Sequence, residues 1–406
     1  MKTAITDHFD VVIVGAGMVG STLACSLAKT TLRVGVLEAR PPVTAWDADS
    51  IDLRVSAVTA ASQQIFKGLG AWDEMVAQGV SPFREMHVWD AGGDGAIHFD
   101  SADIGEDRLG YIVENRVIQK ALFDRMMMQE NVEFICPARL TSMDIHSDTA
   151  DLELEGGRRI KARLVVGADG GNSQVRQLAG IGTQGWSYDQ KAIVATVKTT
   201  EPHRETAWQR FLPEGPLAFL PLRSGGCSIV WTTSPARADE LLGMDEQTFM
   251  DELTQAFDTK LGRIMECGPR AAFPLRLQHV NSYVKERLAL IGDAAHTIHP
   301  LAGQGVNLGL LDAAALSEVL GVAREKGHDI GAFHVLRRYE RWRKGDNLLV
   351  MAVMDGFKRL FGSSLEPLRT LRNFGLNLTN AAMPVKNQIM LHAMGLKGDL
   401  PRLARP

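Results

Sequence analysis

Three glycines near the N-terminus have the spacing of a phosphate-binding turn. Gly15, Gly17 and Gly20 fit the pattern G-x-G-x-x-G and follow the apolar run Phe9–Val14. The first glycine of such a turn permits a tight bend, the second lets backbone N–H groups approach a pyrophosphate, and the third lets helix and strand pack closely. Glu38 lies 18 residues beyond Gly20, where a carboxylate can accept hydrogen bonds from a ribose. The spacing predicts a site for the ADP part of FAD or NAD.

The elements around this turn must hold the phosphates at a helix N-terminus. Phe9–Val14 and Arg33–Leu37 read as buried parallel strands, and Met18–Thr30 has helical spacing between them. Together they predict a right-handed βαβ unit. The same glycine pattern recurs at residues 180–185, but there it follows a predicted helix and no strand precedes it. We therefore reject that second copy.

Two later aspartates also follow predicted strands. Asp169 comes after the run Leu164–Gly167, and Asp293 comes after Leu288–Gly292. Open α/β sheets bind ligands at the carboxyl ends of their strands, so both carboxylates could reach the same ligand. Each could instead cap the helix that follows it. Both interpretations remain open.

A second sheet is predicted between these two aspartates. Four β-rich runs separated by glycine and proline suggest a mostly antiparallel insert, and they are Ala192–Val197, Gln209–Leu212, Leu217–Leu222 and Cys227–Thr232. A hairpin made of Met86–Asp90 and Ala96–Asp100 could join it. After about Ala332 the pattern is helical.

Composition excludes several classes of protein. The chain has 406 residues, 45% of them hydrophobic, and a net charge of -4, which excludes a disordered protein and a nucleic-acid wrapper. Four widely spaced cysteines suggest reduced thiols, and no apolar run reaches the roughly 18 residues that span a bilayer. We expect a cytoplasmic protein. Residues 337–406 carry 13 Lys or Arg against 5 Asp or Glu, so this tail could meet the inner membrane, a partner or neither.

Three blocks in order resemble one family. After the glycine turn come Gly167–Arg176 and the stretch 292–312, which contains HTIHPLAGQGVNLG and ends at Asp312. On these blocks, and on Asp52–Trp72 and Tyr111–Asn115, the chain resembles the group A FAD-dependent aromatic monooxygenases of the para-hydroxybenzoate hydroxylase type. It most closely resembles the ubiquinone-biosynthesis flavin hydroxylases, and among them the 2-polyprenylphenol 6-hydroxylase type. The resemblance covers essentially the whole chain.

The resemblance implies an α/β fold. We expect a Rossmann-like FAD-binding domain with an inserted, mostly antiparallel β-sheet substrate domain and a helical C-terminal tail. The FAD-binding domain would comprise residues 1–85, 101–182 and 283–335. The substrate domain would comprise residues 86–100 and 183–282, and the helical region would comprise residues 336–406.

The resemblance also assigns residues to FAD. The cofactor-binding positions would be Gly15, Gly17, Gly20, Glu38, Arg54, Asn115, Asp169, Asp293, Gly303, Gln304, Gly305 and Asn307. The Pro300 carbonyl would face the substrate hydroxyl. The glycines at 303 and 305 would open a helix, and a helix N-terminus stabilises the anionic edge of reduced flavin by about 0.3–2 kcal/mol.

The reaction implied by the resemblance is ring hydroxylation of a polyprenylphenol in ubiquinone biosynthesis. NADH or NADPH would reduce FAD, O2 would form a flavin C4a-hydroperoxide, and the phenol would gain a hydroxyl group. No catalytic side chain is assigned. Apolar walls for the substrate could come from Phe219, Leu220, Pro221 and Trp231, which could equally form an ordinary sheet core.

Several alternatives remain. His296 and His299 are three residues apart, but no Cys or carboxylate completes a ligand set in that block, so we expect no metal and a structural role for His296. The chain could hydroxylate another aromatic compound. It could also be a catalytically idle FAD-binding subunit of a quinone-synthesis complex. Membership of a multi-enzyme complex and homo-oligomerisation are left open.

Overall fold

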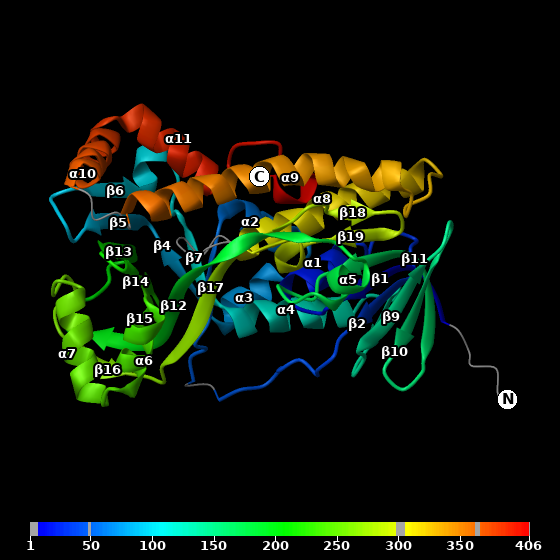
Figure 1. Ribbon diagram of the computed structural model, residues 1–406, viewed down its shortest axis with the longest axis horizontal. Coiled ribbons are helices and arrows are strands. Elements are labelled where there is room, and N and C mark those ends of the chain that lie inside the picture. The colour runs from blue at the N-terminus through cyan, green and yellow to red at the C-terminus, as the bar shows by residue number, and fades with distance from the viewer. Residues whose placement is uncertain (1–6, 48–49, 298–304, 362–365, 406) are drawn as a thin grey trace.

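Two large β-sheets lie side by side, and long C-terminal helices run over both of them (Figure 1). The computed structural model describes residues 7–47, 50–297, 305–361 and 366–405. Within these residues, the chain forms the two large sheets and one small three-stranded sheet. The small sheet lies in the order β3-β7-β4, with strands β3 (Val55–Val58), β4 (Val80–Phe83) and β7 (Gly110–Glu114).

The first large sheet contains the glycine turn. Strands β8, β2, β1, β11 and β19 pair with one another in parallel, whereas β18 pairs antiparallel with β19. Two further antiparallel strands, β10 and β9, extend from β11. The order of the main path is β18-β19-β11-β1-β2-β8. The strands are β1 (Asp7–Val14), β2 (Val34–Leu37), β8 (Val132–Ile135), β9 (Leu140–Ile145), β10 (Ala150–Leu154), β11 (Arg159–Gly167), β18 (Val284–Lys285) and β19 (Leu288–Leu290).

The predicted βαβ unit is confirmed. Strand β1, helix α1 (Met18–Ser26) and strand β2 follow one another, and β1 pairs in parallel with β2. The interior strand positions Val11–Ile13 are fully buried, as expected for a parallel sheet covered on both faces. The helix ends before the predicted Thr30, whose hydroxyl donates instead to the carbonyl of Leu27 and closes a turn.

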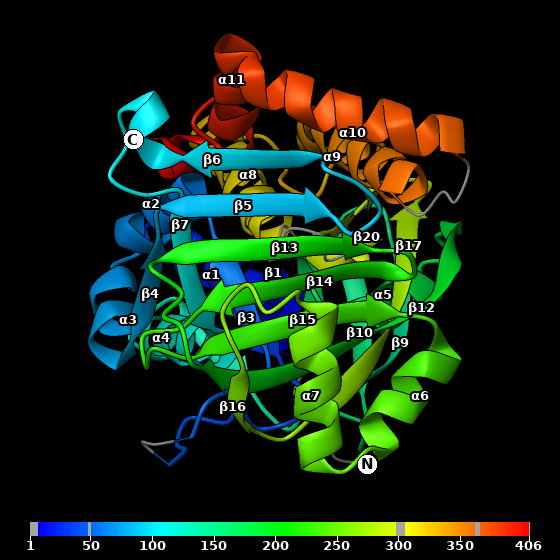
Figure 2. The ribbon, with the colours of Figure 1, turned by 90° about the vertical axis from the view of Figure 1, so that its left-hand side faces the viewer.

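The second large sheet confirms the predicted mostly antiparallel insert. Its order is β20-β17-β12-β15-β14-β13-β5-β6, and β16 pairs with β12. The predicted hairpin β5–β6 joins this sheet through β13, which it pairs with in parallel. Figure 2 shows this sheet nearly face on. Its strands are β5 (Glu85–Asp90), β6 (Ala96–Asp100), β12 (Thr183–Thr199), β13 (Thr206–Leu212), β14 (Gly215–Pro221), β15 (Cys227–Thr233), β16 (Ile264–Cys267), β17 (Ala271–Val280) and β20 (His296–Thr297).

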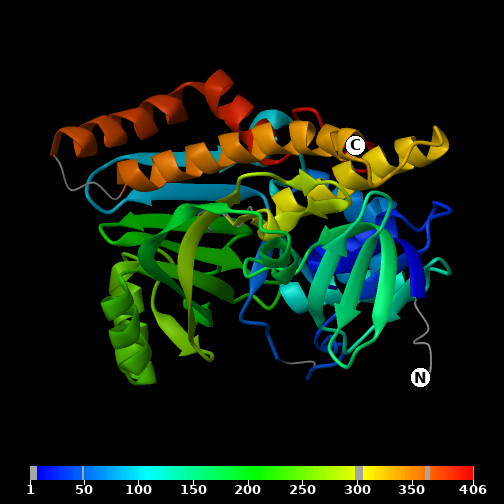
Figure 3. The same cartoon turned by 45° about the vertical axis from the view of Figure 1, so that its right-hand side comes forward.

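Helices cover each sheet differently. Helices α6 (Pro235–Gly243) and α7 (Glu246–Ala256) cover one face of the second sheet, and α1 packs against α4 (Asn115–Met127) and α8 (Gly305–Glu325) beside the first. The remaining helices are α2 (Ala60–Gly68), α3 (Trp72–Gln78), α5 (Gln174–Leu178), α9 (Phe333–Phe361), α10 (Glu366–Ala381) and α11 (Met383–Ala393). The last three run along one side of the molecule, as the orange and red ribbon in Figure 3 shows. The helical C-terminal region is therefore confirmed.

Helix α8 is the most apolar long helix. Among the described residues, it alone has the length and composition of a membrane-crossing helix, which is weak evidence for one. Most of its apolar window (72%) is buried inside the protein. It packs against α1, α2 and α9, so its apolar composition is explained by its place in the core.

Candidate active site

The glycine turn has the geometry that phosphate binding requires. Gly15 has a φ of +104°, and a Cβ atom there would lie 2.5 Å from the carbonyl oxygen of Ala168. A Cβ atom at Gly20 would lie 1.9 Å from the carbonyl oxygen of Gly15. Gly17, the residue that precedes α1, has no atom within 4 Å of an added Cβ. The first and third glycines are thus needed for packing, and the second leaves open space in front of the helix N-terminus.

Glu38 is held beside this turn. It directly follows β2, and its Oε2 accepts a hydrogen bond of 2.8 Å from the backbone N–H of Ala16. Its Oε1 accepts another from the N–H of Arg40 at 3.1 Å. Each carboxylate oxygen keeps a free lone pair for a further donor. The geometry is that of a ribose-binding carboxylate at the carboxyl end of the second strand.

Three strand ends converge at this point. The N–H of Ala168, after β11, donates to the carbonyl of Val14 at 2.8 Å. Gly292, after β19, lies so close to Val19 of α1 that a Cβ atom there would be 3.2 Å from its side chain. Gly309 of α8 lies against the same valine. The three sequence blocks separated along the chain therefore meet around one site.

Asp293 offers an uncommitted carboxylate at this site. Its oxygens accept no hydrogen bond from any described residue, and its side chain reaches solvent. Protein atoms nevertheless surround it, and this desolvation raises the pKa of Asp293, while the charges of His296, Arg54 and Arg276 act to lower it. The guanidinium of Arg54 lies 5.6 Å from the centre of the Phe273 ring. Asp293 can thus accept hydrogen bonds from ligand hydroxyl groups.

Asp169 has the geometry of a helix cap. Its carboxylate accepts hydrogen bonds from the N–H groups of Gln174 and Val175, at 2.7 and 3.1 Å, and from the Ser173 hydroxyl at 2.5 Å. These bonds satisfy the first turn of α5. They support the capping interpretation, and contact with a cofactor stays a prediction.

Two asparagines connect segments around the site. Asn307 is buried, its Oδ1 accepts from the Ser62 hydroxyl at 2.7 Å, and its amide donates to the carbonyl of Ala57 at 2.8 Å. It therefore joins the start of α8 to the connection between β3 and α2. Asn115 accepts a hydrogen bond of 2.7 Å from Ser56 on the same strand β3. Both amides position the segments that the flavin would contact.

A buried polar network lies behind the site, and sequence reasoning missed it. The carboxylate of Asp312 on α8 contacts Nε2 of His296 at 2.5 Å and accepts from the amide of Asn347 at 3.1 Å. Burial alone would raise the pKa of Asp312, but the charges of His296 and Arg343 and the hydrogen bonds hold it below its usual value. His296 thus sits in a buried network that links the β19–β20 segment, α8 and α9.

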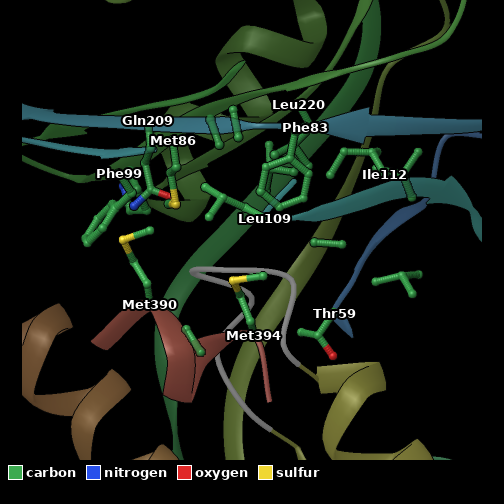
Figure 4. A pocket seen from close by; sticks show the side chains of 18 of the residues that line it. Thr59, Phe83, Met86, Phe99, Leu109, Ile112, Gln209, Leu220, Met390 and Met394 are labelled. Atoms are coloured by element: carbon green, nitrogen blue, oxygen red, sulfur yellow. The ribbon is translucent and has the colours of Figure 1, made fainter. Parts of the chain in front are cut away.

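An apolar cavity of about 1210 Å³, its open mouth included, lies between β3, the second sheet and α11. Figure 4 shows Thr59 at one end and Met86, Phe99 and Gln209 at the other, with Met390 and Met394 reaching in from the C-terminal helix. Seventeen of the 20 lining residues are apolar, and the other three are Thr59, Gln209 and Thr232. It comprises Val55, Ala57, Val58, Thr59, Phe83, Met86, Phe99, Leu109, Ile112, Ala207, Gln209, Pro216, Ala218, Leu220, Val230, Thr232, Ile389, Met390, Ala393 and Met394.

Of the four predicted substrate walls, only Leu220 lines this cavity. Side chains alternate along a strand, so Phe219 and Pro221 point to the opposite face of β14. Phe219 is fully buried and stacks on Phe257 at 3.7 Å between ring centres, and Trp231 packs near Phe249. The structure thus corrects the prediction: Phe219 and Trp231 belong to the sheet core under α6 and α7, and Pro221 does not reach the cavity.

Some predicted residues cannot be placed. Pro300, Gly303, Gln304 and His299 lie outside the described residues, and Gly305 is the first residue of α8. Sequence reasoning missed the cavity walls on α11 and on the β5–β6 hairpin. The only signal was the Met-rich composition of the tail, since Met390 and Met394 are four apart on one helix face.

Comparison with known proteins decides what the site holds. The family model described as "FAD binding domain" matches residues 8–344. The chain belongs to this FAD-binding family. It is a flavoprotein monooxygenase of the ubiquinone-biosynthesis hydroxylase group, with FAD as cofactor and NAD(P)H as the co-substrate typical of the family. The predicted family, enzyme class and cofactor are confirmed.

Three curated relatives support this membership. The chain is 42% identical over 387 residues to 3-demethoxyubiquinol 3-hydroxylase of Escherichia coli (strain K12), covering 95% of this chain and 98% of that protein. It is 40% identical to ubiquinone hydroxylase UbiL of Rhodospirillum rubrum, covering 98% and 92%. It is 39% identical to ubiquinone biosynthesis monooxygenase COQ6, mitochondrial, of Xenopus tropicalis, covering 95% and 93%. The narrower resemblance to 2-polyprenylphenol 6-hydroxylase stays a prediction.

The fold matches solved monooxygenases as well. The crystal structure of p-nitrophenol 4-monooxygenase PnpA from Pseudomonas putida DLL-E4 aligns with a TM-score of 0.79 over 96% of this chain and 99% of that one, at 19% identity. This likeness supports the fold alone. The open space at Gly17, the carboxylate of Glu38 and the uncommitted carboxylate of Asp293 fit an extended dinucleotide such as FAD.

Proposed function

We propose that the protein hydroxylates the aromatic ring of a polyprenylphenol intermediate of ubiquinone biosynthesis, using NAD(P)H and O2. The observation that carries this proposal is the mainly apolar cavity beside Thr59 and the start of α8. A hydrocarbon chain gains about 0.8 kcal/mol for each CH₂ group that it buries, and such a lining suits a prenylated ring. Bound FAD supplies the activation of O2 that hydroxylation requires.

The protein's own residues would bind FAD, orient the substrate and keep water out of the cavity. Gly17 and the N-terminus of α1 would hold the pyrophosphate, Glu38 the ribose, and Asp293 hydroxyl groups of the ribityl region. The methionines and aliphatic residues of the cavity would exclude water, which otherwise diverts activated oxygen to hydrogen peroxide.

Isotope incorporation tests this function. The purified, FAD-loaded protein is mixed with ¹⁸O₂, NADH or NADPH, and a short-chain prenylphenol. We expect a product heavier by one ¹⁸O atom, and nicotinamide oxidation that depends on the phenol. Nicotinamide oxidation that yields only hydrogen peroxide with every prenylphenol, or none at all, would favour another aromatic substrate or a non-catalytic subunit.

We also infer that the α10–α11 face contacts a lipid surface from which the substrate is drawn. Leu378, Met383, Val385 and Ile389 are 41–55% exposed on these helices, and Ile389 also lines the cavity. The excess of basic residues over residues 337–406, 13 Lys or Arg against 5 Asp or Glu, would favour anionic lipid. Cytoplasmic location, membership of a multi-enzyme complex and self-association stay predictions from the sequence.

A further inference from the structure

One buried amide in the cavity has no partner. Gln209 lies on β13, is 6% exposed and lines the cavity, yet its side chain makes no hydrogen bond with any residue that the structure describes. Its amide atoms face the cavity, where water or a ligand can reach them. A ligand that displaces this water without replacing its hydrogen bonds leaves the amide unsatisfied, which costs free energy. A leucine or methionine at this position would not carry that cost. The amide therefore points to a polar group on the molecule that occupies the cavity.

The surroundings leave this amide accessible. Gln209 pairs with Ala218 on β14, and Ala218 pairs in turn with Val230 on β15. Ala207 lies two residues earlier on the same face of β13. These small side chains leave the long amide standing free of the sheet, beside Met86 and Phe99 (Figure 4).

The other polar side chains of the lining are less available for hydrogen bonds to a ligand. The Thr59 hydroxyl is within 3.3 Å of both Ser62 and Asn307, so it belongs to the network at the start of α8. Thr232 carries a single short hydroxyl on β15. Gln209 is the one side chain of this lining whose hydrogen-bond donor and acceptor are two separate atoms.

We propose that Gln209 recognises the oxygen substituents of the substrate ring and thereby sets specificity. Its Oε1 accepts from a ring hydroxyl, and its Nε2 donates to a neighbouring methoxy or hydroxyl oxygen. The preferred substrate class is then a prenylated phenol with two adjacent ring oxygens, because a prenyl chain offers the amide nothing. This inference rests on the proposed function and deepens it.

Binding of two matched phenols tests the inference. The FAD-loaded protein is titrated, without NAD(P)H, with 2-prenylphenol and with 2-methoxy-6-prenylphenol, and the change in flavin absorbance gives each Kd. The test variant is Gln209→Met, which keeps the length of the side chain and suits a methionine-rich lining. The matched control is Gln255→Met, on the exposed surface of α7 across the sheet.

We expect the wild type and Gln255→Met to bind the methoxyphenol about tenfold more tightly than the plain phenol, the usual size for one buried hydrogen bond. Gln209→Met should lose this preference and bind both phenols more weakly, the methoxyphenol by the larger factor, because the plain phenol loses only the hydrogen bond to its hydroxyl group. An unchanged preference in Gln209→Met, or no preference in the wild type, overturns the inference. A yellow wild-type protein that responds to neither phenol would instead refute the proposed function, and this inference with it.

Discussion

The carboxylate of Asp312 accepts a hydrogen bond of 3.0 Å from Nε of Arg343, and both side chains are buried to 2% exposure or less. The pair joins α8, which begins at the site, to α9, which leads to the cavity wall on α11. Nη2 of the same guanidinium donates to Oδ1 of Asn347 at 2.9 Å. A buried charge of this kind is tolerated only with its partner in place.

Loss of one member of this pair should therefore be costly. We expect Arg343→Met to lower the free energy of unfolding by about 3–5 kcal/mol, because the carboxylate of Asp312 stays buried without its cation. Urea unfolding measures this value. Arg341→Met, at an exposed position of the same helix, should change it by less than about 0.5 kcal/mol. Equal effects of the two substitutions would contradict the role of the pair.

Two substitutions in the glycine turn should affect cofactor binding and stability differently. Gly17→Ala places a methyl group in open space, so the apoprotein should keep its stability while FAD affinity falls at least tenfold, because the methyl group occupies the path of the pyrophosphate. The methyl group of Gly20→Ala would clash with the carbonyl of Gly15, so this substitution should lower both the stability of the apoprotein and its affinity for FAD. Flavin absorbance per protein measures FAD binding, and urea unfolding of the apoprotein measures its stability. Full FAD content in Gly17→Ala would refute the assignment of this turn.

Adjacent residues of β14 should behave in opposite ways. Phe219→Ala should lower the free energy of unfolding by about 3–5 kcal/mol through a core cavity, and leave the KM for the phenol nearly unchanged. Leu220→Trp should raise the KM at least tenfold by filling the substrate cavity, with a cost of less than about 2 kcal/mol. Thermal unfolding and steady-state kinetics check both. A raised KM in Phe219→Ala would mean that the two faces of the strand are misassigned.

The acid side of the stability profile should depend on His279. Burial, with help from the charges of Lys344 and His296, lowers the pKa of His279 to about 4. Between about pH 6.5 and pH 4 the unfolded chain binds a proton that the folded chain does not, so stability falls as the pH drops through this window.

His279→Gln removes this contribution. We expect the wild type to lose about 2 kcal/mol more unfolding free energy between pH 7 and pH 5 than His279→Gln does. Urea titrations at the two pH values provide the comparison. The same loss in both proteins would show that His279 titrates normally in the folded state.

The exposed helix face should control attachment to lipid. Leu378→Ser with Val385→Ser removes two side chains that are 55% and 53% exposed, and should weaken sedimentation with vesicles containing anionic phospholipid at least fivefold. Val76→Ser, on α3, removes a comparably exposed residue (44%) and should have no effect. Binding that survives the double substitution in low salt would exclude this face.

Local patterns predicted the strands, the glycine turn and Glu38 because each depends on neighbours in sequence. Strand periodicity also held the information that Phe219 and Leu220 face opposite ways, and the prediction of both as walls overlooked it. The four groups that contact the Asp312 carboxylate, which are the N–H of Gly292 and the side chains of His296, Arg343 and Asn347, come from segments far apart in the chain. No local pattern encodes them. The same holds for α11, which reaches the cavity only through tertiary packing.

The late position of α11 in the sequence has a consequence for synthesis. The residues of the glycine turn are synthesised first, and α11, with Met390 and its C-cap residue Met394, follows more than 350 residues later. The last segment of the nucleotide site, which ends at Gly309, is also synthesised before α11, so every segment of that site exists before the cavity receives its final wall.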